Sequence, residues 1–288
     1  MDIISIPVAV YNGWFEWQLD LFWHNHKKQY GNIAANKAHA IVIKRNNIRE
    51  KKCEKYEWNI NIPNSMCEAH FDYRQDLLDH NYMPINIQIG LEQIINKFKD
   101  DEKLELLDCD VFHMRKHPFF DIKDDEMYVT DIYENWHLLS KTANKSVIAK
   151  YFKNDGKYYN GGFVPIIAKA KVFKQILPDW IWIHKDIVDN FGGVQHNSLR
   201  WWAGMYSLQA ACERNKINMI AKDVCYLPNI NTLQESHYLA HYSCDPKFDK
   251  RKYPNIDYQN FPDNIFYKAV LDWKSGSLAS KEFTKLFL

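Results

Sequence analysis

Residues 103–112 have the sequence KLELLDCDVF, a largely apolar run that leads into two aspartates, Asp108 and Asp110. We expect the run to form a short strand, with the aspartates directly at its carboxyl end. Ligands of open α/β sheets bind outside the carboxyl ends of the strands, so this position favours a ligand site. The Asp-x-Asp triplet alone carries little weight, because a chain with this much Asp contains about two of them by chance.

The chain before this strand is typical of a parallel sheet. Residues 3–10 form a continuous apolar run, as buried parallel strands do, and residues 39–43 predict a second strand. Apolar residues recur at helical spacing over 14–30, so the chain opens as a β-α-β unit with a right-handed crossover. An amphipathic helix is expected over 87–98. These elements predict an α/β fold with a parallel sheet that is flanked by helices.

Shorter patterns predict further elements. Residues 56–62 alternate like an edge strand, and residues 68–80 favour a helix. In the second half, strands are expected at 127–132, 146–152, 163–168 and 238–244, and helices at 171–177, ended by Pro178, and at 199–215. One domain over residues 1–245 accounts for these elements, with residues 246–288 as a helical C-terminal extension packed on it.

Composition and charge exclude several classes of function. The chain of 288 residues is 46% hydrophobic and has a net charge of +1, which favours a globular fold and argues against nucleic-acid binding. No apolar stretch approaches the length of a membrane span, so we expect no integral membrane segment. The six cysteines are scattered without CxxC pairs, which favours a reducing compartment and a cytoplasmic protein.

The two aspartates offer hard carboxylate oxygens, which Mg²⁺ and Mn²⁺ prefer, and these ions in turn bridge a diphosphate. On the position of the two aspartates alone, an acidic pair that only caps a turn is an equally good interpretation. A haloacid-dehalogenase-type phosphatase also uses Asp-x-Asp after an apolar strand, with Asp108 as nucleophile. Such enzymes usually carry the motif on their first strand, whereas about 100 residues precede it here. The aromatic content of 15% would also suit a non-catalytic carbohydrate-binding domain.

Three stretches in a fixed order resemble one known family. They are residues 81–112, which include Asp108-Cys109-Asp110-Val111-Phe112; residues 158–206, which include Tyr158-Tyr159-Asn160-Gly161-Gly162, Leu177-Pro178-Asp179-Trp180 and the segment 201–206; and residues 241–245, His-Tyr-Ser-Cys-Asp. Together they resemble the GT-A glycosyltransferases. Within that group, the chain is most similar to the plant and algal hydroxyproline O-arabinosyltransferases and peptidyl-serine galactosyltransferases.

The resemblance implies a GT-A fold, which is Rossmann-like with a mixed but mainly parallel sheet flanked by helices. It also implies a metal and donor site. Asp108 and Asp110 would bind Mn²⁺ or Mg²⁺ and the diphosphate of a UDP-sugar, and His241 would be the third metal ligand. The end of the first strand would receive the nucleotide base through Pro7, Val8, Ala9, Tyr11 and Asn12. Other donor and acceptor contacts would come from Cys109, Asn160, Gly161, Gly162, Trp201 and Trp202.

The implied reaction is displacement of a nucleoside diphosphate from the anomeric carbon by a hydroxyl of a glycan or protein acceptor. The resemblance favours a retaining enzyme, in which the leaving phosphate oxygen takes the acceptor proton. An inverting enzyme needs a carboxylate base, for which Asp186 and Asp189 are the candidates. Two departures leave the acceptor open. The family tends to carry an acidic residue near the position of Gly204, and its secreted plant members have membrane anchors that this sequence does not predict.

Overall fold

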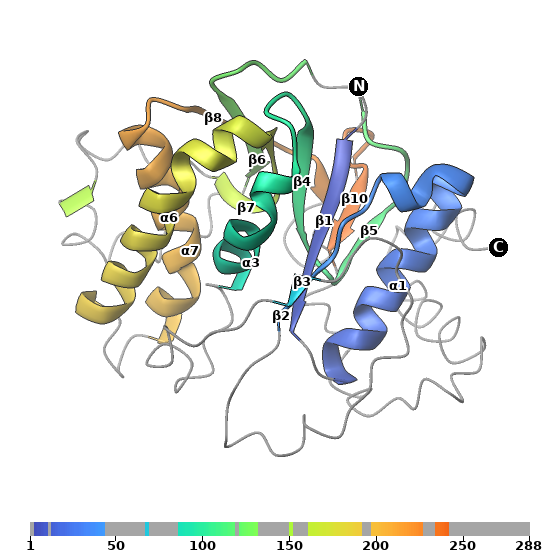
Figure 1. The fold of residues 1–288 in the computed structure, drawn as a ribbon, viewed down its shortest axis with the longest axis horizontal. Helices are drawn as coiled ribbons and strands as arrows, with labels where there is room; N and C mark the ends of the chain where they lie inside the picture. Colours follow the sequence, from blue (N-terminus) through green and yellow to red (C-terminus); the bar gives the residue numbers. More distant parts are fainter. Residues whose placement is uncertain are drawn as a thin grey trace.

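The computed structural model describes residues 3–10, 13–43, 67–68, 86–118, 121–131, 150–151, 161–191, 197–226 and 234–241. Within these ranges the main feature is a seven-stranded sheet with the order β3-β2-β1-β4-β7-β6-β8 (Figure 1). Its strands are β1 (Ile3–Val10), β2 (Ile41–Ile43), β3 (Cys67–Glu68), β4 (Lys103–Asp108), β6 (Glu126–Asp131), β7 (Gly161–Lys169) and β8 (Asn218–Lys222).

The strand directions place most carboxyl ends at one edge of this sheet. β1 pairs in parallel with β2 and β4, and β2 pairs in parallel with β3. β7 is antiparallel to both β4 and β6, and β6 is parallel to β8. The described sheet is therefore mixed but mainly parallel, as expected from the sequence. The beginning of β7 lies at the same edge as the carboxyl ends of β1 and β4.

A smaller sheet has the order β5-β10-β9, with β5 (Val111–His113), β9 (Cys225–Tyr226) and β10 (Leu239–His241). β5 follows β4 after a turn of two residues, Cys109 and Asp110. β10 is antiparallel to β5 and parallel to β9. The smaller sheet thus joins the chain that follows Asp108 to segments that come much later in the sequence.

Helices and the smaller sheet cover the two faces of the main sheet. α3 (Asn86–Ile94), α6 (Ala170–Phe191) and α7 (Asn197–Arg214) pack on one face, and α1 (Gly13–Tyr30) and the smaller sheet pack on the other (Figure 1). Short 3₁₀ helices, Gly31–Asn36 and Ile95–Lys97, follow α1 and α3. Each face of the main sheet has its own apolar core, the first under α3, α6 and α7 and the second under α1 and the smaller sheet. Leu104 and Leu106 of β4 belong to the first core and Leu107 to the second. Burial on both faces explains the nearly continuous apolar sequences of the central strands.

Most of the predicted elements are present. The strands expected at 3–10, 39–43, 103–107, 127–132, 163–168 and 238–244, and the helices expected at 14–30, 87–98 and 199–215, correspond to β1, β2, β4, β6, β7, β10, α1, α3 and α7. The strands β5, β8 and β9 were not predicted, because they are short and lack a continuous apolar run. The predictions for 56–62, 69–80 and the extension 246–288 lie outside the described residues.

Three local predictions are wrong. α6 continues through Pro178 instead of ending there. Pro178 is exposed, whereas Trp180 and Ile183 continue the buried apolar stripe, so packing outweighs the backbone hydrogen bond that proline removes. Residues 150–151 are helical rather than extended, because short apolar runs do not distinguish helix from strand. Glu68 belongs to β3 rather than to a helix, since it pairs with β2.

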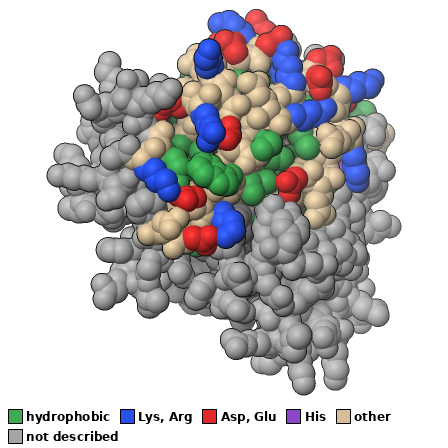
Figure 2. All heavy atoms as spheres, turned by 60° about the vertical axis from the view of Figure 1, so that its left-hand side comes forward, with side chains coloured by type: hydrophobic (Ala, Val, Ile, Leu, Met, Phe, Trp, Pro, Cys, Tyr) green, Lys and Arg blue, Asp and Glu red, His purple; other side chains and the backbone are tan. Residues whose placement is uncertain are grey.

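The face around α6 has side chains of both charges. Figure 2 shows Lys, Arg, Asp and Glu around a small apolar patch on this face. Trp182 in α6 is 50% exposed, and the Arg214 guanidinium lies 5.5 Å from the centre of its ring. Small patches with charged rims are ordinary on solvated surfaces. None of the helices in the described part of the chain has the length and apolar character needed to cross a bilayer.

Gly90 in α3 lies directly against Ile41 in β2. A Cβ atom at Gly90 would come within 2.2 Å of Ile41 Cγ2, whereas one at Gly204 in α7 would lie 3.4 Å from its nearest neighbour, His184. Ile41 is buried and β-branched, so its side chain does not move aside easily. We expect Gly90→Ala to lower the free energy of unfolding by about 1–3 kcal/mol, and the matched Gly204→Ala to leave it unchanged or raise it. Urea denaturation measures both, and equal stabilities would contradict the close packing of α3 on β2.

His184 makes the stability of the fold depend on pH. Gln88 Nε2 donates a hydrogen bond of 2.8 Å to His184 Nδ1, and burial lowers the pKa of His184 to about 3. The unfolded chain therefore binds a proton at this residue between about pH 6.5 and pH 3 that the folded chain does not, so stability falls as the pH drops through this window. We expect the free energy of unfolding, from urea denaturation, to fall between pH 7 and pH 5, and to fall less in His184→Gln. An identical pH dependence in the variant would contradict this.

Candidate metal centre

Three side chains from separate parts of the fold meet at the carboxyl edge of β4. Asp108 is the last residue of β4, and Asp110 lies in the turn before β5. The β5–β10 pairing places His241 opposite Val111, and therefore beside Asp110. Cys109, between the aspartates, is buried in the second core and anchors the turn. The resulting site combines a strand end, a turn and a strand of the smaller sheet.

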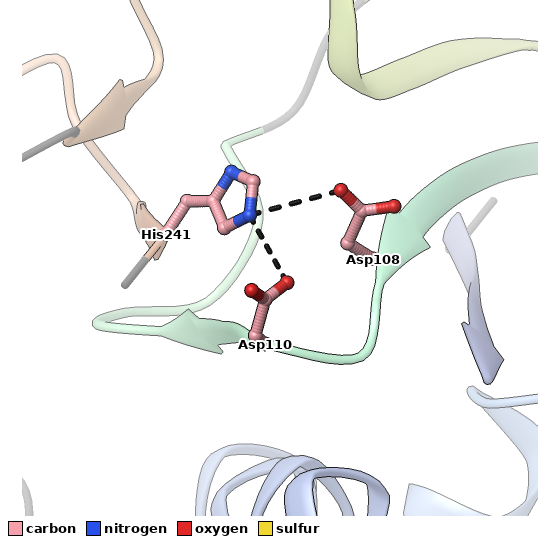
Figure 3. Close-up of side chains that lie close together, drawn as sticks. All are labelled: Asp108, Asp110 and His241. Carbon is pink, nitrogen blue, oxygen red and sulfur yellow. Dashed lines mark hydrogen bonds and ion pairs between the residues drawn. The ribbon is translucent and has the colours of Figure 1, made fainter. Parts of the chain in front are cut away.

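The three side chains point toward one another (Figure 3). His241 Nε2 lies 3.0 Å from Asp110 Oδ1 and 3.7 Å from Asp108 Oδ2. One ligand atom from each residue lies within 4.8 Å of the other two. The side chains of His241 and Asp110 are 1% and 7% exposed, whereas that of Asp108 is 36% exposed. The site is therefore closed behind His241 and Asp110 and reaches solvent at Asp108.

This donor set fits a divalent cation. Ligand atoms bound to one Mg²⁺ or Mn²⁺ at about 2.1 Å lie within about 4.2 Å of one another, so small side-chain movements would complete the coordination. Two carboxylates supply hard oxygens, and Mn²⁺ tolerates the imidazole nitrogen better than Mg²⁺ does. The exposed side at Asp108 leaves coordination positions for oxygens of a ligand. Within the described residues, this is the group of His, Cys, Asp and Glu side chains that meets the geometry of a metal site.

Two other predicted site segments lie at the same edge. In the parallel pairing of β1 with β4, Pro7 is the partner of Leu107 and Val8 is the partner of Asp108. Ala9 follows and is buried in the second core. Gly161 and Gly162 begin β7, which is the antiparallel neighbour of β4 on its other side. The ends of β1 and β4 and the start of β7 therefore lie side by side.

Several predicted site residues lie beyond what the structure describes. Tyr11, Asn12 and Asn160 fall outside the described residues. Trp201 and Trp202 lie in α7, but their side chains are not described. The proposed contacts of these residues therefore stay predictions.

The candidate inverting bases form ion pairs along α6. Asp186 pairs with Lys150 at 2.6 Å and also accepts hydrogen bonds from the Tyr151 hydroxyl and from Asn190. Asp189 pairs with Lys185 one helical turn earlier. Neither belongs to the group formed by Asp108, Asp110 and His241. The four-residue spacing of Lys185 and Asp189 is that of neighbours on a helix, but the helix was expected to end at Pro178, and nothing in the sequence links Lys150 to Asp186.

His237, near His241 in the sequence, has a separate partner. Its Nε2 lies 2.6 Å from Asp223 Oδ1, and its Nδ1 accepts a hydrogen bond from the backbone of Gln234. Glu105, a fully buried carboxylate three residues before Asp108, was not among the predicted site residues. A charged residue within an otherwise apolar strand is the signal that could have identified it.

Fold and site together define an α/β protein with a candidate divalent-cation centre at the carboxyl edge of a mixed sheet. The sequence matches no protein-family model and no curated protein. Among solved structures, the chain is similar to the galactosyltransferase LgtC in complex with donor and acceptor sugar analogs, with 13% identity and a TM-score of 0.48 over 99% of this chain and 100% of that chain. It is also similar to an active-site mutant of LgtC, with 13% identity and a TM-score of 0.47 over 93% and 95% of the two chains. At this level of similarity, function must be argued from the site itself.

Cation binding should depend on the buried ligands. We expect Asp110→Asn and His241→Gln each to raise the dissociation constant for Mn²⁺ at least about tenfold, because each removes one of three protein ligands. Asp124, an exposed aspartate paired with Lys169 and Lys171, provides the matched control Asp124→Asn, which should bind Mn²⁺ like the unmodified protein. Electron paramagnetic resonance of free Mn²⁺ measures the affinity. Equal affinity in all three variants would rule out this group as the binding site.

Proposed function

We propose that the protein is a metal-dependent glycosyltransferase that moves a sugar from a nucleotide-sugar donor, a UDP-sugar, to a hydroxyl of a glycan or protein acceptor. One observation carries the proposal, the meeting of Asp108, Asp110 and His241 at the carboxyl edge of β4. Their donor atoms suit Mn²⁺ or Mg²⁺, and the exposed side of the site at Asp108 leaves room for diphosphate oxygens. When bound, the cation supplies positive charge that stabilises the leaving diphosphate.

The neighbouring strands supply the rest of the donor site in this proposal. The end of β1 is in register with Asp108, so a nucleotide held by Pro7, Val8 and Ala9, and by Tyr11 and Asn12 beyond them, has its diphosphate close to the carboxylates. Gly161 and Gly162 begin β7, the neighbour of β4 on the other side, and their lack of side chains allows the donor sugar or the acceptor to approach the backbone. Catalysis then depends mainly on how these segments orient donor and acceptor.

We infer a retaining reaction from the surroundings of the candidate bases. Asp186 and Asp189 lie in α6 and are engaged in ion pairs with Lys150 and Lys185, and neither belongs to the group at the candidate metal centre. In the retaining reaction, the bond from the anomeric carbon to the phosphate oxygen breaks and the bond to the acceptor oxygen forms. The acceptor proton passes to the leaving phosphate oxygen, so no protein base is required. The narrower resemblance to the hydroxyproline O-arabinosyltransferase group stays a prediction, as does the acceptor.

The phosphatase alternative has less support. The Asp-x-Asp motif ends β4, the fourth strand along the described chain, rather than the first. The position of His241 beside both aspartates also fits three ligands of one cation better than it fits a phosphatase, in which Asp108 is the nucleophile and Asp110 a neighbouring acid. A non-catalytic carbohydrate-binding domain would need no such group.

Donor hydrolysis distinguishes these possibilities. With Mn²⁺ and a panel of UDP- and GDP-sugars, we expect release of nucleoside diphosphate from one UDP-sugar, and stabilisation by UDP plus Mn²⁺ in a thermal shift experiment. Asp108→Asn should lower the hydrolysis rate at least about 100-fold, which corresponds to about 2.7 kcal/mol of transition-state stabilisation, while Asp124→Asn should retain it.

Two results would count against a transferase. The first is the absence of both nucleotide-dependent stabilisation and donor hydrolysis across the whole panel. The second is hydrolysis of p-nitrophenyl phosphate that is abolished by Asp108→Asn, which would identify a phosphatase.

A further inference from the structure

A second group of polar side chains lies between the main sheet and the smaller sheet. Glu105 of β4 is fully buried, and its carboxylate accepts hydrogen bonds from Ser5 Oγ of β1 at 2.9 Å and from His113 Nε2 of β5 at 3.1 Å. The Tyr238 hydroxyl, directly before β10, donates to the other carboxylate oxygen. We call Glu105, Ser5, His113 and Tyr238 the Glu105 network. It links the main sheet to two segments of the smaller sheet.

The Glu105 network and the candidate metal centre use the same three chain segments. Glu105 precedes Asp108 by three residues, Tyr238 precedes His241 by three, and His113 follows Asp110 by three. Three residues of extended chain span about 10 Å. Each segment therefore carries one residue of the candidate metal centre and, about 10 Å away, one residue of the Glu105 network.

Two side chains of helix α1 bind the backbone of β5 at His113, the residue whose ring contacts Glu105. The Asn25 side chain forms two hydrogen bonds with the backbone of His113, accepting from its N–H at 2.8 Å and donating to its carbonyl at 3.0 Å. Gln29 donates to the same carbonyl at 3.2 Å. His113 is thus fixed through its backbone by α1 and through its ring by Glu105. A shift of β5 relative to β4 would break the hydrogen bonds of His113 to Asn25 and to Glu105.

A buried carboxylate at the position of Glu105 contributes less to the stability of the fold than an apolar side chain of similar size often would. Removing a carboxylate from water costs free energy that hydrogen bonds only partly return, and apolar residues of similar size often replace buried charges without loss of stability. Burial on its own raises the pKa of Glu105, but hydrogen bonds from His113 and Tyr238 and the nearby charge of His113 and His117 lower it to about 2. The carboxylate therefore stays charged and accepts these hydrogen bonds throughout the neutral pH range.

We propose that the Glu105 network positions the metal centre, because it fixes β5 and β10 against β4 and so holds His241 within reach of Asp108 and Asp110. Glu105, His113 and Tyr238 are positioning residues in this account and do not contact the cation. Directional hydrogen bonds can set such a distance, whereas apolar packing between two sheets tolerates small displacements. The role of the bound cation rests on the proposed function, but the effect on His241 does not.

The test compares two buried hydrogen-bonded pairs on opposite faces of the main sheet. Glu105→Gln removes the charge of the Glu105 network with little change of shape. Gln88→Leu, the matched control, breaks the bond between Gln88 and His184 in the other core. Both variants should lower the melting temperature. Only Glu105→Gln should raise the dissociation constant for Mn²⁺, by at least about tenfold, and change the line shape of bound Mn²⁺ in electron paramagnetic resonance.

A second readout needs no metal. In the metal-free protein, the ¹⁵N signals of the His241 ring report its contacts with Asp110 and Asp108. We expect these signals to move in Glu105→Gln and to stay in place in Gln88→Leu. If the unmodified protein does not bind Mn²⁺, the proposed function fails, and the His241 signals still decide whether the Glu105 network positions this residue.

Tyr238→Phe provides a milder variant. It removes one hydrogen bond of the Glu105 network but keeps the ring and the charge of Glu105, so it tests the proposal even if Glu105→Gln does not fold. It should move the His241 signals in the same direction by a smaller amount. The proposal is overturned if the variants of the network that fold leave the His241 signals unchanged, or if Gln88→Leu moves them equally.

Discussion

The antiparallel pairing of β5 with β10 is the interaction on which the candidate site depends. Asp110 and His241 are separated by 131 residues along the chain, and this ladder brings them to 3.0 Å. β5 in turn is joined to β4 by a turn of only two residues, so its position follows from the place of β4 in the main sheet. The metal-binding geometry therefore depends on how the smaller sheet sits against the main sheet.

The interface between the two sheets combines apolar burial with a few directional contacts. Residues such as Leu107, Val111 and Leu239 pack together in the second core and supply the free energy of association. Apolar packing has little directional preference, so it does not by itself fix the register of short strands such as β5 and β10. The hydrogen bonds that His113 donates, from its ring to Glu105 and from its backbone N–H to Asn25, are directional and help to fix the position of β5. A buried charge and an apolar core thus have different roles at one interface.

Local sequence patterns were sufficient for much of the fold and for part of the site. The apolar runs of β1 and β4 and the helical spacing in α1 and α3 predicted those elements, because these segments are long enough to show a period. The position of Asp108 and Asp110 at a strand end followed from the same patterns. The prediction that a helix ends at Pro178 was wrong, because the buried stripe that continues to Trp180 and Ile183 becomes visible only when α6 packs on the sheet. Asp186 and Asp189 were candidate bases because of their position in the sequence. Their ion pairs depend on the folded structure, because Lys185 lies one helical turn before Asp189 in α6 and Lys150 belongs to a segment outside this helix.

The sequence by itself determined the order of the main elements, the burial of the central strands and the presence of a carboxylate pair at the end of β4. These are local properties, since they depend on residues within one strand or one helix. His241 was named as a third ligand only through the family resemblance, and the tertiary structure is what places it beside Asp108 and Asp110. Only the tertiary structure decided that Glu105 is buried with Ser5, His113 and Tyr238 around it. Such contacts depend on the register of strands far apart in the chain, and the stability of a buried charge depends on partners that no single segment contains.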